Sequence, residues 1–282
     1  MITGDHPLTA ARIASDLGII AKDGKALTGD QLDQLSDEAA LDKATSEVSV
    51  YARVAPEHKL KIVESLQRQG NIVAMTGDGV NDAPAVKSAD IGVAMGITGT
   101  DVTKNVADMV LADDNFATIV GAVGEGRRIY DNIRKAIQFL LASNMSEVLG
   151  VFVATLLGFT LMNPVHLLFI NLITDCFPAL ALGLEKGEPD VMERPPRPSD
   201  DGIFAGGLGW DIAYQGILIT VITLVSYIIG HCMEVGYFEM PKGVSDDGMT
   251  MAFLTMSMCE IFHSFNMRSQ RRSVFSLPSH SK

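Results

Sequence analysis

The stretch MTGDGVNDAP, residues 75–84, decides the fold of the first part of the chain. It follows the apolar run Ile72–Met75 and places Asp78, Asn81 and Asp82 in a glycine-rich turn. A buried strand that ends in such a turn predicts an α/β fold with its acidic residues at the carboxyl edge of the sheet, where ligands of open α/β folds bind. Hard oxygen ligands beside free backbone N–H groups suit Mg²⁺ with a phosphate. Because Asp-Gly is also a common turn dipeptide, this stretch alone leaves open an ordinary acidic hairpin turn.

Composition narrows the possible classes of protein. A length of 282 residues predicts about two domains. The net charge of −12 argues against nucleic-acid binding. Cys176, Cys232 and Cys259 are too few and too scattered for a disulfide framework or a zinc site. The start MITGDHPLTA has neither the basic flank nor the apolar core of a signal peptide, so membrane insertion would depend on internal spans.

Charge-poor runs dominate from about Phe139 onward and predict a bundle of four membrane helices. The predicted spans are residues 139–162, 164–184, 209–230 and 249–266. The first three have about the 20 residues that a bilayer helix needs, whereas the fourth is short and polar and needs shielding by its neighbours. Only Asn163–Pro164 separates the first two spans, which predicts a tight turn between antiparallel helices.

The distribution of basic residues predicts the orientation of these spans. Basic residues occur in the proline-rich loop between spans two and three and after span four: Lys186, Arg194, Arg197, Arg268, Arg271 and Arg272. The loop between spans three and four has only Lys242. The positive-inside rule therefore predicts that the soluble part, the proline-rich loop and the C-terminus lie in the cytoplasm. We expect a multi-pass protein of the plasma membrane with both termini cytoplasmic.

Polar residues inside the first two spans indicate a cation site. Asn144 and Glu147 lie three residues apart, and Asn171, Thr174 and Asp175 follow at i, i+3 and i+4, so each set shares one helix face. An Asp at membrane depth costs about 2.5–3.5 kcal/mol, which marks such residues as functional candidates. The set is all oxygen and suits Ca²⁺ or Mn²⁺. The alternative is that these residues only hold the helices together.

Two features predict the shapes of the membrane helices. Pro178 follows Asp175 by three residues, which frees a backbone carbonyl and loosens the second span. Residues 127–139 have Ile129, Ile133 and Ile137 at helical spacing, interleaved with basic residues. This pattern predicts one long helix that continues from the soluble part into the bilayer. The alternative is an ordinary juxtamembrane amphipathic helix.

Seven stretches, in order along nearly the whole chain, resemble a known family. They are MITGDHPLTA (1–10), ARVAPEHKLKIV (52–63), MTGDGVNDAPAVKSADIGVAMG (75–96), VLADDNFATI (110–119), SNMSE (143–147), FINLITDCFPALALG (169–183) and DVMERPPR (190–197). The chain resembles the C-terminal part of a P-type cation-transporting ATPase of the calcium-pump branch, typified by the sarcoplasmic-reticulum and secretory-pathway pumps. Its compact loops indicate a bacterial pump. The resemblance implies a partial haloacid-dehalogenase-like α/β phosphorylation domain (1–126), a stalk helix (127–138), an all-α transmembrane helix bundle (139–266) and a cytoplasmic tail (267–282).

The resemblance also implies a role for each matching residue. Thr3 and Asp5 resemble the residues that hold the phosphoryl group, and Lys59 resembles the lysine that neutralises the aspartyl-phosphate. Asp78 resembles the Mg²⁺ ligand, with Asn81 and Asp82 supporting the phosphate site. The glycines of the same motifs, expected to bind the cofactor, are Gly4, Gly77 and Gly79. The positions implied for the transported Ca²⁺ are Asn144, Glu147, Asn171, Thr174 and Asp175.

The fourth span departs from the two-calcium pumps. Those pumps carry a glutamate two residues before the cysteine that corresponds to Cys259, and here that place is Ser257. The nearest carboxylate is Glu260. The resemblance therefore implies one weakened ion site and transport of a single ion per cycle.

The chain lacks other parts of the family's pattern. It contains no DKTGT, the motif whose aspartate takes the γ-phosphoryl of ATP, and no nucleotide-binding domain. The nucleophile strand of these pumps lies between the strand ending at Thr3 and the one ending at Asp78, so its absence predicts two unpaired sheet edges. We expect a fragment that cannot hydrolyse ATP without the N-terminal half of the pump, in the same or a separate chain. A short membrane-bound ion-binding or regulatory module stays open, whereas the missing nucleophile argues against a stand-alone phosphatase.

Overall fold

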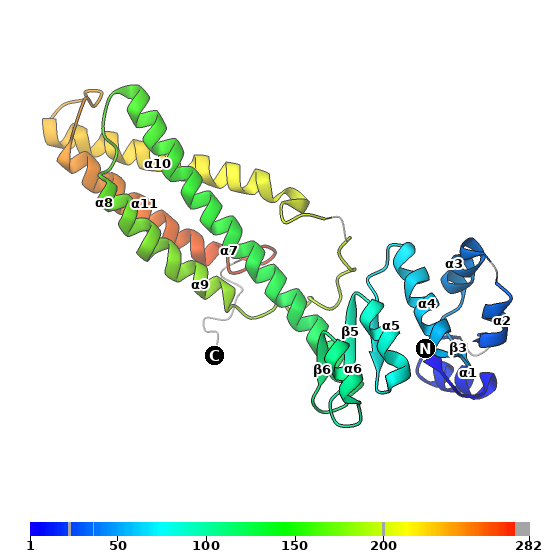
Figure 1. The fold of residues 1–282 in the computed structure, drawn as a ribbon. Coiled ribbons are helices and arrows are strands. Elements are labelled where there is room, and N and C mark those ends of the chain that lie inside the picture. The colour runs from blue at the N-terminus through cyan, green and yellow to red at the C-terminus, as the bar shows by residue number, and fades with distance from the viewer. Residues whose placement is uncertain (22–23, 36, 199–200, 274–282) are drawn as a thin grey trace. The chain divides into compact units, whose positions relative to one another are not determined.

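The computed structural model describes residues 1–21, 24–35, 37–198 and 201–273, which form two compact units (Figure 1). Unit 1 is Met1–Gly121 and unit 2 is Ala122–Lys282. Residues 199–200 of the predicted proline-rich loop and residues 274–282 of the predicted tail lie outside the described residues.

Unit 1 is an α/β structure with two parallel sheets, each of three strands. One sheet has the order β1-β3-β2, with strands Ile2–Thr3, Tyr51–Ala52 and Leu27–Thr28. The other has the order β4-β5-β6, with strands Ala74–Gly77, Ile91–Met95 and Met109–Leu111. The helices are α1 (Pro7–Asp16), α2 (Gly29–Asp33), α3 (Glu38–Glu47), α4 (Pro56–Arg68), α5 (Ala83–Ser88) and α6 (Asp101–Val106), with a 3₁₀ turn η1 (Val80–Asp82).

Strand β4 begins later than the apolar run predicts. Ile72 is 62 % exposed, so the prediction of a buried strand over Ile72–Met75 is wrong at its start. The Asp90 carboxylate accepts the N–H of Val73 at 2.8 Å, and the regular pairing with β5 starts at Ala74. The strand therefore extends through the first half of the motif and ends at Gly77.

Helix α4 contributes to two separate cores in unit 1. Ile62 packs with Leu32 and Tyr51, whereas Val63 packs with Met75 and its neighbours below β4. Since consecutive helix positions point about 100° apart, adjacent side chains serve different cores. Pro56 begins the helix at its first position, where a missing N–H costs nothing.

Strands β1 and β4 each lie at one end of their sheet, as the sequence predicts. Ile2 of β1 is partly buried against the cluster that contains Met75 of β4. Strands β1 and β4 thus share a core but pair in different sheets. This arrangement agrees with the predicted absence of a strand between them.

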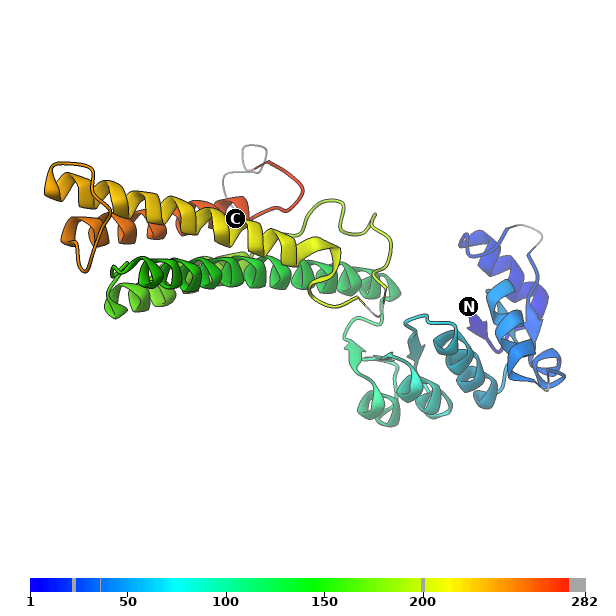
Figure 2. The ribbon, with the colours of Figure 1, turned by 90° about the horizontal axis from the view of Figure 1, so that it is seen from above.

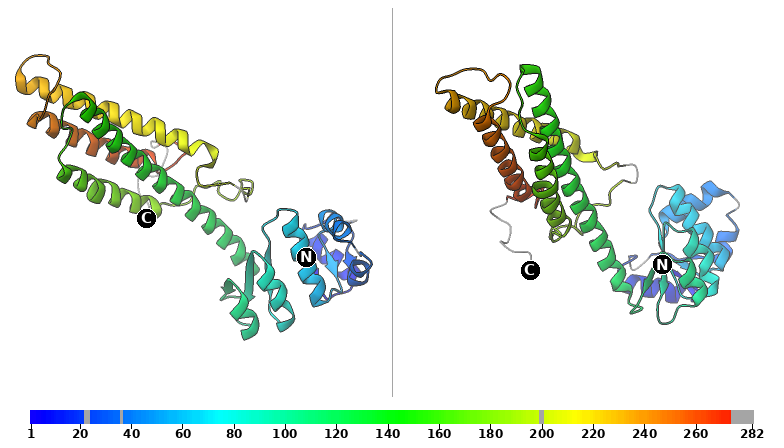
Figure 3. Two further views of the ribbon diagram at one scale, coloured as in Figure 1. Left: turned by 45° about the horizontal axis from the view of Figure 1, so that its top comes forward. Right: turned by 60° about the vertical axis from the view of Figure 1, so that its left-hand side comes forward.

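Unit 2 is a bundle of helices, which lie side by side in Figures 2 and 3. They are α7 (Phe116–Leu157, which begins in unit 1), α8 (Pro164–Phe169), the π-helical segment η2 (Ile170–Asp175), α9 (Cys176–Gly183), the 3₁₀ turn η3 (Ala205–Gly207), α10 (Leu208–Val235) and α11 (Asp246–Asn266). Within the described residues, three helical stretches are long and apolar enough to cross a membrane: Phe116–Leu157, Pro164–Gly183 and Ala205–Val235. The fourth predicted span corresponds to α11 and stays a prediction.

The connection between the first two spans is longer than predicted. Helix α7 ends at Leu157, and Gly158 adopts a left-handed conformation (φ +86°) that stops it. The next residues hydrogen-bond to the loop before α11, where the N–H of Thr160 donates to the carbonyl of Gly243 at 2.7 Å. The predicted turn at Asn163–Pro164 is therefore only the last part of the connection, with Pro164 at the start of α8.

The second span is loosened where the sequence predicts it. The chain is π-helical over Ile170–Asp175, between two ordinary helical segments. Pro178 has no N–H for the carbonyl of Thr174, four residues earlier, so a regular α-helix cannot continue through this turn. The prediction of a loosened helix is confirmed.

Helix α7 is a single helix of 42 residues, which confirms the predicted continuity from residue 127 into the apolar segment (Figure 3). Its inward face is polar at first: Asn132, Lys135 and Gln138 are buried. Lys135 donates to the carbonyl of Arg268 at 3.0 Å. Ile129 and Ile133 are about half exposed instead. The isoleucine spacing therefore predicted the helix correctly but not its buried face, which is the polar face that hydrogen-bonds to the rest of the bundle.

Candidate phosphate edge and cation cluster

The predicted phosphate residues Lys59 and Asp82 contact each other in unit 1. Lys59 on α4 donates from Nζ to the Asp82 carboxylate, which is 7 % exposed and also accepts the N–H of Gly79 at 3.3 Å. Burial by itself raises the pKa of Asp82, but the hydrogen bond and charge of Lys59 outweigh it, and the pKa lies below its usual range. The pair thus presents an ammonium group beside the end of β4.

The other predicted residues of this edge lie at the ends of two strands. At the end of β1, the Thr3 hydroxyl donates to Asp5 at 3.1 Å and accepts the N–H of Asp5 at 3.2 Å. Directly after β4, Asp78 and Asn81 are exposed to solvent. The structure therefore pairs Thr3 with Asp5, and Asp78 keeps an open carboxylate.

Among the predicted glycines, Gly77 is required by packing. A Cβ at Gly77 would lie 2.4 Å from Cβ of Asp82 and 2.9 Å from Cγ2 of Val86. Gly79 has no such neighbour closer than 3.7 Å, and Gly4 has open space around it. Gly77 lets β4 approach Asp82 closely, and the predicted cofactor-binding roles of Gly4 and Gly79 stay predictions.

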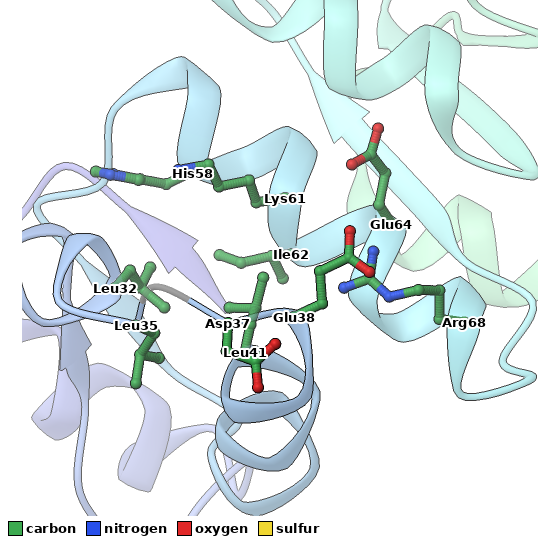
Figure 4. A pocket seen from close by; sticks show the side chains of 10 residues that line it. All are labelled: Leu32, Leu35, Asp37, Glu38, Leu41, His58, Lys61, Ile62, Glu64 and Arg68. Carbon is green, nitrogen blue, oxygen red and sulfur yellow. The ribbon is translucent and has the colours of Figure 1, made fainter.

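A pocket of about 320 Å³ lies between α2, α3 and α4 (Figure 4). Its apolar wall includes Leu32, Leu41 and Ile62, and charged side chains such as Lys61 and Arg68 surround it. None of the residues predicted from the sequence to bind phosphate or metal lines this pocket. It is therefore distinct from the phosphate edge.

Three carboxylates meet inside unit 2: Glu147 of α7, Asp175 of η2 and Glu260 of α11. They are 8 %, 1 % and 0 % exposed, and one oxygen from each lies within 4.8 Å of the others. Two oxygens bound to one Ca²⁺ at about 2.3–2.6 Å each lie at most about 5 Å apart, so this spacing fits a single ion. At an effective dielectric of ~20, two carboxylate charges 4.8 Å apart repel by about 3 kcal/mol. A bound cation relieves this repulsion.

Two hydroxyl groups connect these carboxylates. Ser143 Oγ, fully buried, lies 2.6 Å from Glu260 Oε1 and 2.8 Å from Asp175 Oδ2. The Thr174 hydroxyl donates to Glu260 Oε2 at 3.1 Å. Thr174 therefore lies in the predicted site. Ser143 was missed, although it begins the SNMSE stretch and lies one helical turn before Glu147.

The two predicted amides lie at the margin of the cluster. Asn171 is exposed, yet its amide nitrogen lies 3.0 and 2.9 Å from the two Glu147 oxygens. Asn144 is also exposed and donates to the carbonyl of Leu140 within its own helix at 2.8 Å. The structure thus brings together Glu147, Thr174 and Asp175, keeps Asn171 beside Glu147, and leaves Asn144 outside.

The structure adds a carboxylate of α11 to this site. Ser257 has a hydroxyl with no hydrogen-bond partner among the described residues, whereas Glu260 enters the cluster. The signal was helical spacing: Ala252, Met256 and Glu260 follow one another at four-residue intervals, and all three are fully buried. The expectation of one weakened ion site and a single transported ion stays a prediction.

Comparisons with family models divide the chain in the same way. Residues 1–90 match the model described as haloacid dehalogenase-like hydrolase. Residues 159–282 match the model described as cation transporting ATPase, C-terminus. The phosphate edge thus lies in the first match, and Asp175 and Glu260 lie in the second.

Curated relatives match nearly the whole chain. A calcium-transporting ATPase of Bacillus subtilis is 51 % identical over 98 % of this chain and 30 % of its own length. Calcium-transporting ATPase 1 of Bacillus cereus is 48 % identical over 98 % of the chain and 32 % of its own length. The human calcium-transporting ATPase type 2C member 1 is 41 % identical over 98 % and 29 %. The chain spans about a third of the length of these relatives. By sequence it is similar to the C-terminal part of P-type cation-transporting ATPases.

Proposed function

We propose that the chain is part of an ATP-driven pump for Ca²⁺ and that Glu147, Asp175 and Glu260 hold the transported ion. The observation that carries this proposal is the meeting of three buried carboxylates from three different helical segments. Such a cluster is unfavourable in a bundle without a cation, which argues for a binding role. The calcium-transporting relatives supply the choice of ion.

The exposed amides support a site that further helices complete. Asn144 and Asn171 lie in apolar helices yet are exposed in this chain. In a bilayer they would face hydrocarbon, which is unfavourable for an amide that hydrogen-bonds only partly. We infer that helices from the N-terminal half of the pump cover them, so that both amides act with the cluster in the assembled protein.

Unit 1 supplies the magnesium and phosphate half of the phosphorylation site in this proposal. The open carboxylate of Asp78 is a hard ligand of the kind Mg²⁺ takes, and Lys59 lies beside Asp82 to balance phosphoryl charge. Mg²⁺ supplies neutralisation of phosphate charge when bound. Thr3 and Asp5 hold the phosphoryl group from the end of β1, and Asn81 supports it from the turn after β4.

The aspartate nucleophile and the ATP site belong to the partner half. The free edges of β1 and β4 support this inference, because one parallel strand inserted between them would join both sheets. The chain alone is then unable to hydrolyse ATP.

The protein spans a membrane through its apolar helices, and we propose the orientation predicted by the basic residues. Exposed aromatic side chains lie near both ends of α10: Trp210 and Tyr214 near its start, and Tyr237 and Phe238 just after its end. Aromatic residues of this kind favour the two bilayer interfaces. The end with Trp210 faces the cytoplasm, and the membrane is the plasma membrane.

Calcium binding by the chain in lipid nanodiscs tests the proposed cation site. We expect Glu147→Gln and Asp175→Asn each to weaken Ca²⁺ binding at least about tenfold, because each removes a charged ligand. The control is Asp211→Asn, an exposed carboxylate in the first turn of α10, which should bind like the wild type. Unchanged binding in both cluster variants, or an equal loss in Asp211→Asn, would contradict the proposal.

A further inference from the structure

Asp114, two residues before α7, binds a loop far from it in sequence. One carboxylate oxygen accepts the N–H of Ile97 at 2.9 Å, and the other accepts the N–H of Thr98 at 2.7 Å and its hydroxyl at 2.8 Å. These bonds, the one from Ile97 foremost, lower the pKa of Asp114 to about 2. The residue also has a positive φ of 49°, a conformation that few residues other than glycine, asparagine and aspartate accept.

The segment that Asp114 holds is bonded in turn to the predicted magnesium loop. The N–H of Thr100 donates to the carbonyl of Asp78 at 2.9 Å, and the hydroxyl of Thr103 donates to the carbonyl of Gly79 at 2.9 Å. Thr103 is fully buried, and its hydroxyl also lies 2.9 Å from that of Thr100. The backbone that carries the Asp78 carboxylate is thus fixed from residues 100–103.

The connection between these two sets of bonds is closely packed. A Cβ at Gly96 would lie 2.5 Å from the carbonyl oxygen of Leu111, and one at Gly99 would lie 2.0 Å from that of Met95. The N–H of Gly96 donates to the same Leu111 carbonyl at 2.8 Å. A loop packed this tightly transmits a displacement at one end to the other.

We propose that Asp114 is a positioning residue for magnesium: through residues 97–103 it fixes the backbone at Asp78 and ties it to the segment from which α7 begins. This inference rests on the proposed role of Asp78. It adds a residue outside the phosphate motifs whose loss displaces the metal ligand without removing it. The linkage lies entirely within unit 1.

The neighbouring aspartate provides a matched control. Asp113 accepts the N–H of Asn115 at 3.1 Å and the hydroxyl of Thr118 at 2.7 Å, so its bonds stay at the start of α7 and none reaches residues 97–98. Asp113→Asn and Asp114→Asn change the charge equally at adjacent positions. Asparagine also accepts the positive φ at 114, so Asp114→Asn tests the hydrogen bonds and not the backbone conformation.

Two measurements on the full chain in nanodiscs test the proposal. One is amide hydrogen exchange of residues 77–82 and 97–103. The other is binding of Mn²⁺, a paramagnetic substitute for Mg²⁺, at Asp78, read from the broadening of the NMR signals of residues 77–82 so that Mn²⁺ in the carboxylate cluster of unit 2 does not count. Asp114→Asn should speed exchange at Thr100 at least about tenfold, the factor expected when bonds to a charged acceptor are lost, and should weaken Mn²⁺ binding several-fold. Asp113→Asn should leave both unchanged.

Wild-type exchange and Mn²⁺ binding in Asp114→Asn, or equal effects of the two variants, would overturn the proposal. Faster exchange with unchanged Mn²⁺ binding would also overturn it, because Asp114 would then be structural only. A wild-type chain that binds no Mn²⁺, while Asp78→Asn exchanges like the wild type, would instead contradict the magnesium site itself.

Discussion

At the scale of single residues, the chain shows how neighbouring side chains serve different purposes. Lys59 contacts Asp82, whereas His58 lines the pocket. His58 accepts the N–H of Ala55 at Nδ1 and donates from Nε2 to the Asp33 carboxylate at 2.8 Å. Sequence reasoning singled out Lys59 because of its motif. Spacing alone could not distinguish it from Lys61, which lies two residues later and lines the pocket.

Replacement of Lys59 should destabilise unit 1, because Lys59 compensates the charge of Asp82 at the phosphate edge. Without its partner, the buried Asp82 carboxylate is left uncompensated, and Lys59→Met should lower the free energy of unfolding by about 1–3 kcal/mol at neutral pH. This is less than for a fully buried pair, since Lys59 keeps some exposure (22 %). The control is Lys61→Met, which should change stability little.

The pH dependence of this difference follows from the Asp82 pKa. In the wild type this pKa is lowered, so the stabilisation is present above the unfolded carboxyl pKa and is lost as pH falls through the folded value. In Lys59→Met burial still raises the pKa of Asp82, and only backbone N–H groups such as that of Gly79 oppose it, so this pKa is higher than in the wild type. Denaturant unfolding from about pH 7 to pH 3 should therefore show the two proteins converging at acid pH. A difference that stays constant over this range would contradict the assignment.

At the scale of elements, the loop between α9 and η3 is bound to α7 by two arginines. Arg194 donates to Asp131 of α7 at 2.6 Å and to Asp190 at 2.9 Å, and the Arg197 guanidinium lies 4.0 Å from the centre of the Tyr130 ring. The hydrogen bond from Arg194 lowers the pKa of Asp190 to about 2, so the ion pair between Arg194 and Asp190 persists down to strongly acid pH. The DVMERPPR stretch (190–197) thus holds its loop against α7, the helix that carries Glu147.

Arg194→Lys should weaken the contact between this loop and α7. Lysine keeps the charge but cannot make the forked contact with two carboxylates, so amide exchange of Val191 and Glu193, whose N–H groups are bonded within this loop, should rise by the equivalent of about 1–2 kcal/mol. Arg271→Lys is the matched control, because Arg271 contacts the same Asp190 at 3.3 Å from an exposed position. Equal amide exchange in the two variants would show that the Arg194 contacts do not stabilise the loop.

Much of the element structure followed from local patterns. The unbroken α7 and the loosened turn before Pro178 were predicted from periodicity and proline. The long connection after Leu157 was not, because it depends on hydrogen bonds to Gly243, far away in sequence. The sequence named Glu260 only as the nearest carboxylate, although its four-residue spacing from Met256 and Ala252 predicts the same buried helix face.

At the scale of the whole molecule, two features remain incomplete within the described residues. Strands β1 and β4 end their sheets, and Asn144 and Asn171 stay exposed in apolar helices. Both fit a chain that spans about a third of its relatives' length, since strands and helices from the remaining part would cover them. The motif MTGDGVNDAP predicted the edge of the sheet but could not reveal its partner strand.

Reconstitution with an N-terminal partner tests the central claim most directly. The chain should be co-inserted into vesicles with the part of the Bacillus subtilis calcium-transporting ATPase that precedes its match to this chain. We expect Ca²⁺-stimulated ATP hydrolysis by the combination, none by either part alone, and loss of the stimulation with Glu260→Gln. Hydrolysis by the chain alone, or Ca²⁺ stimulation that survives Glu260→Gln, would contradict this claim.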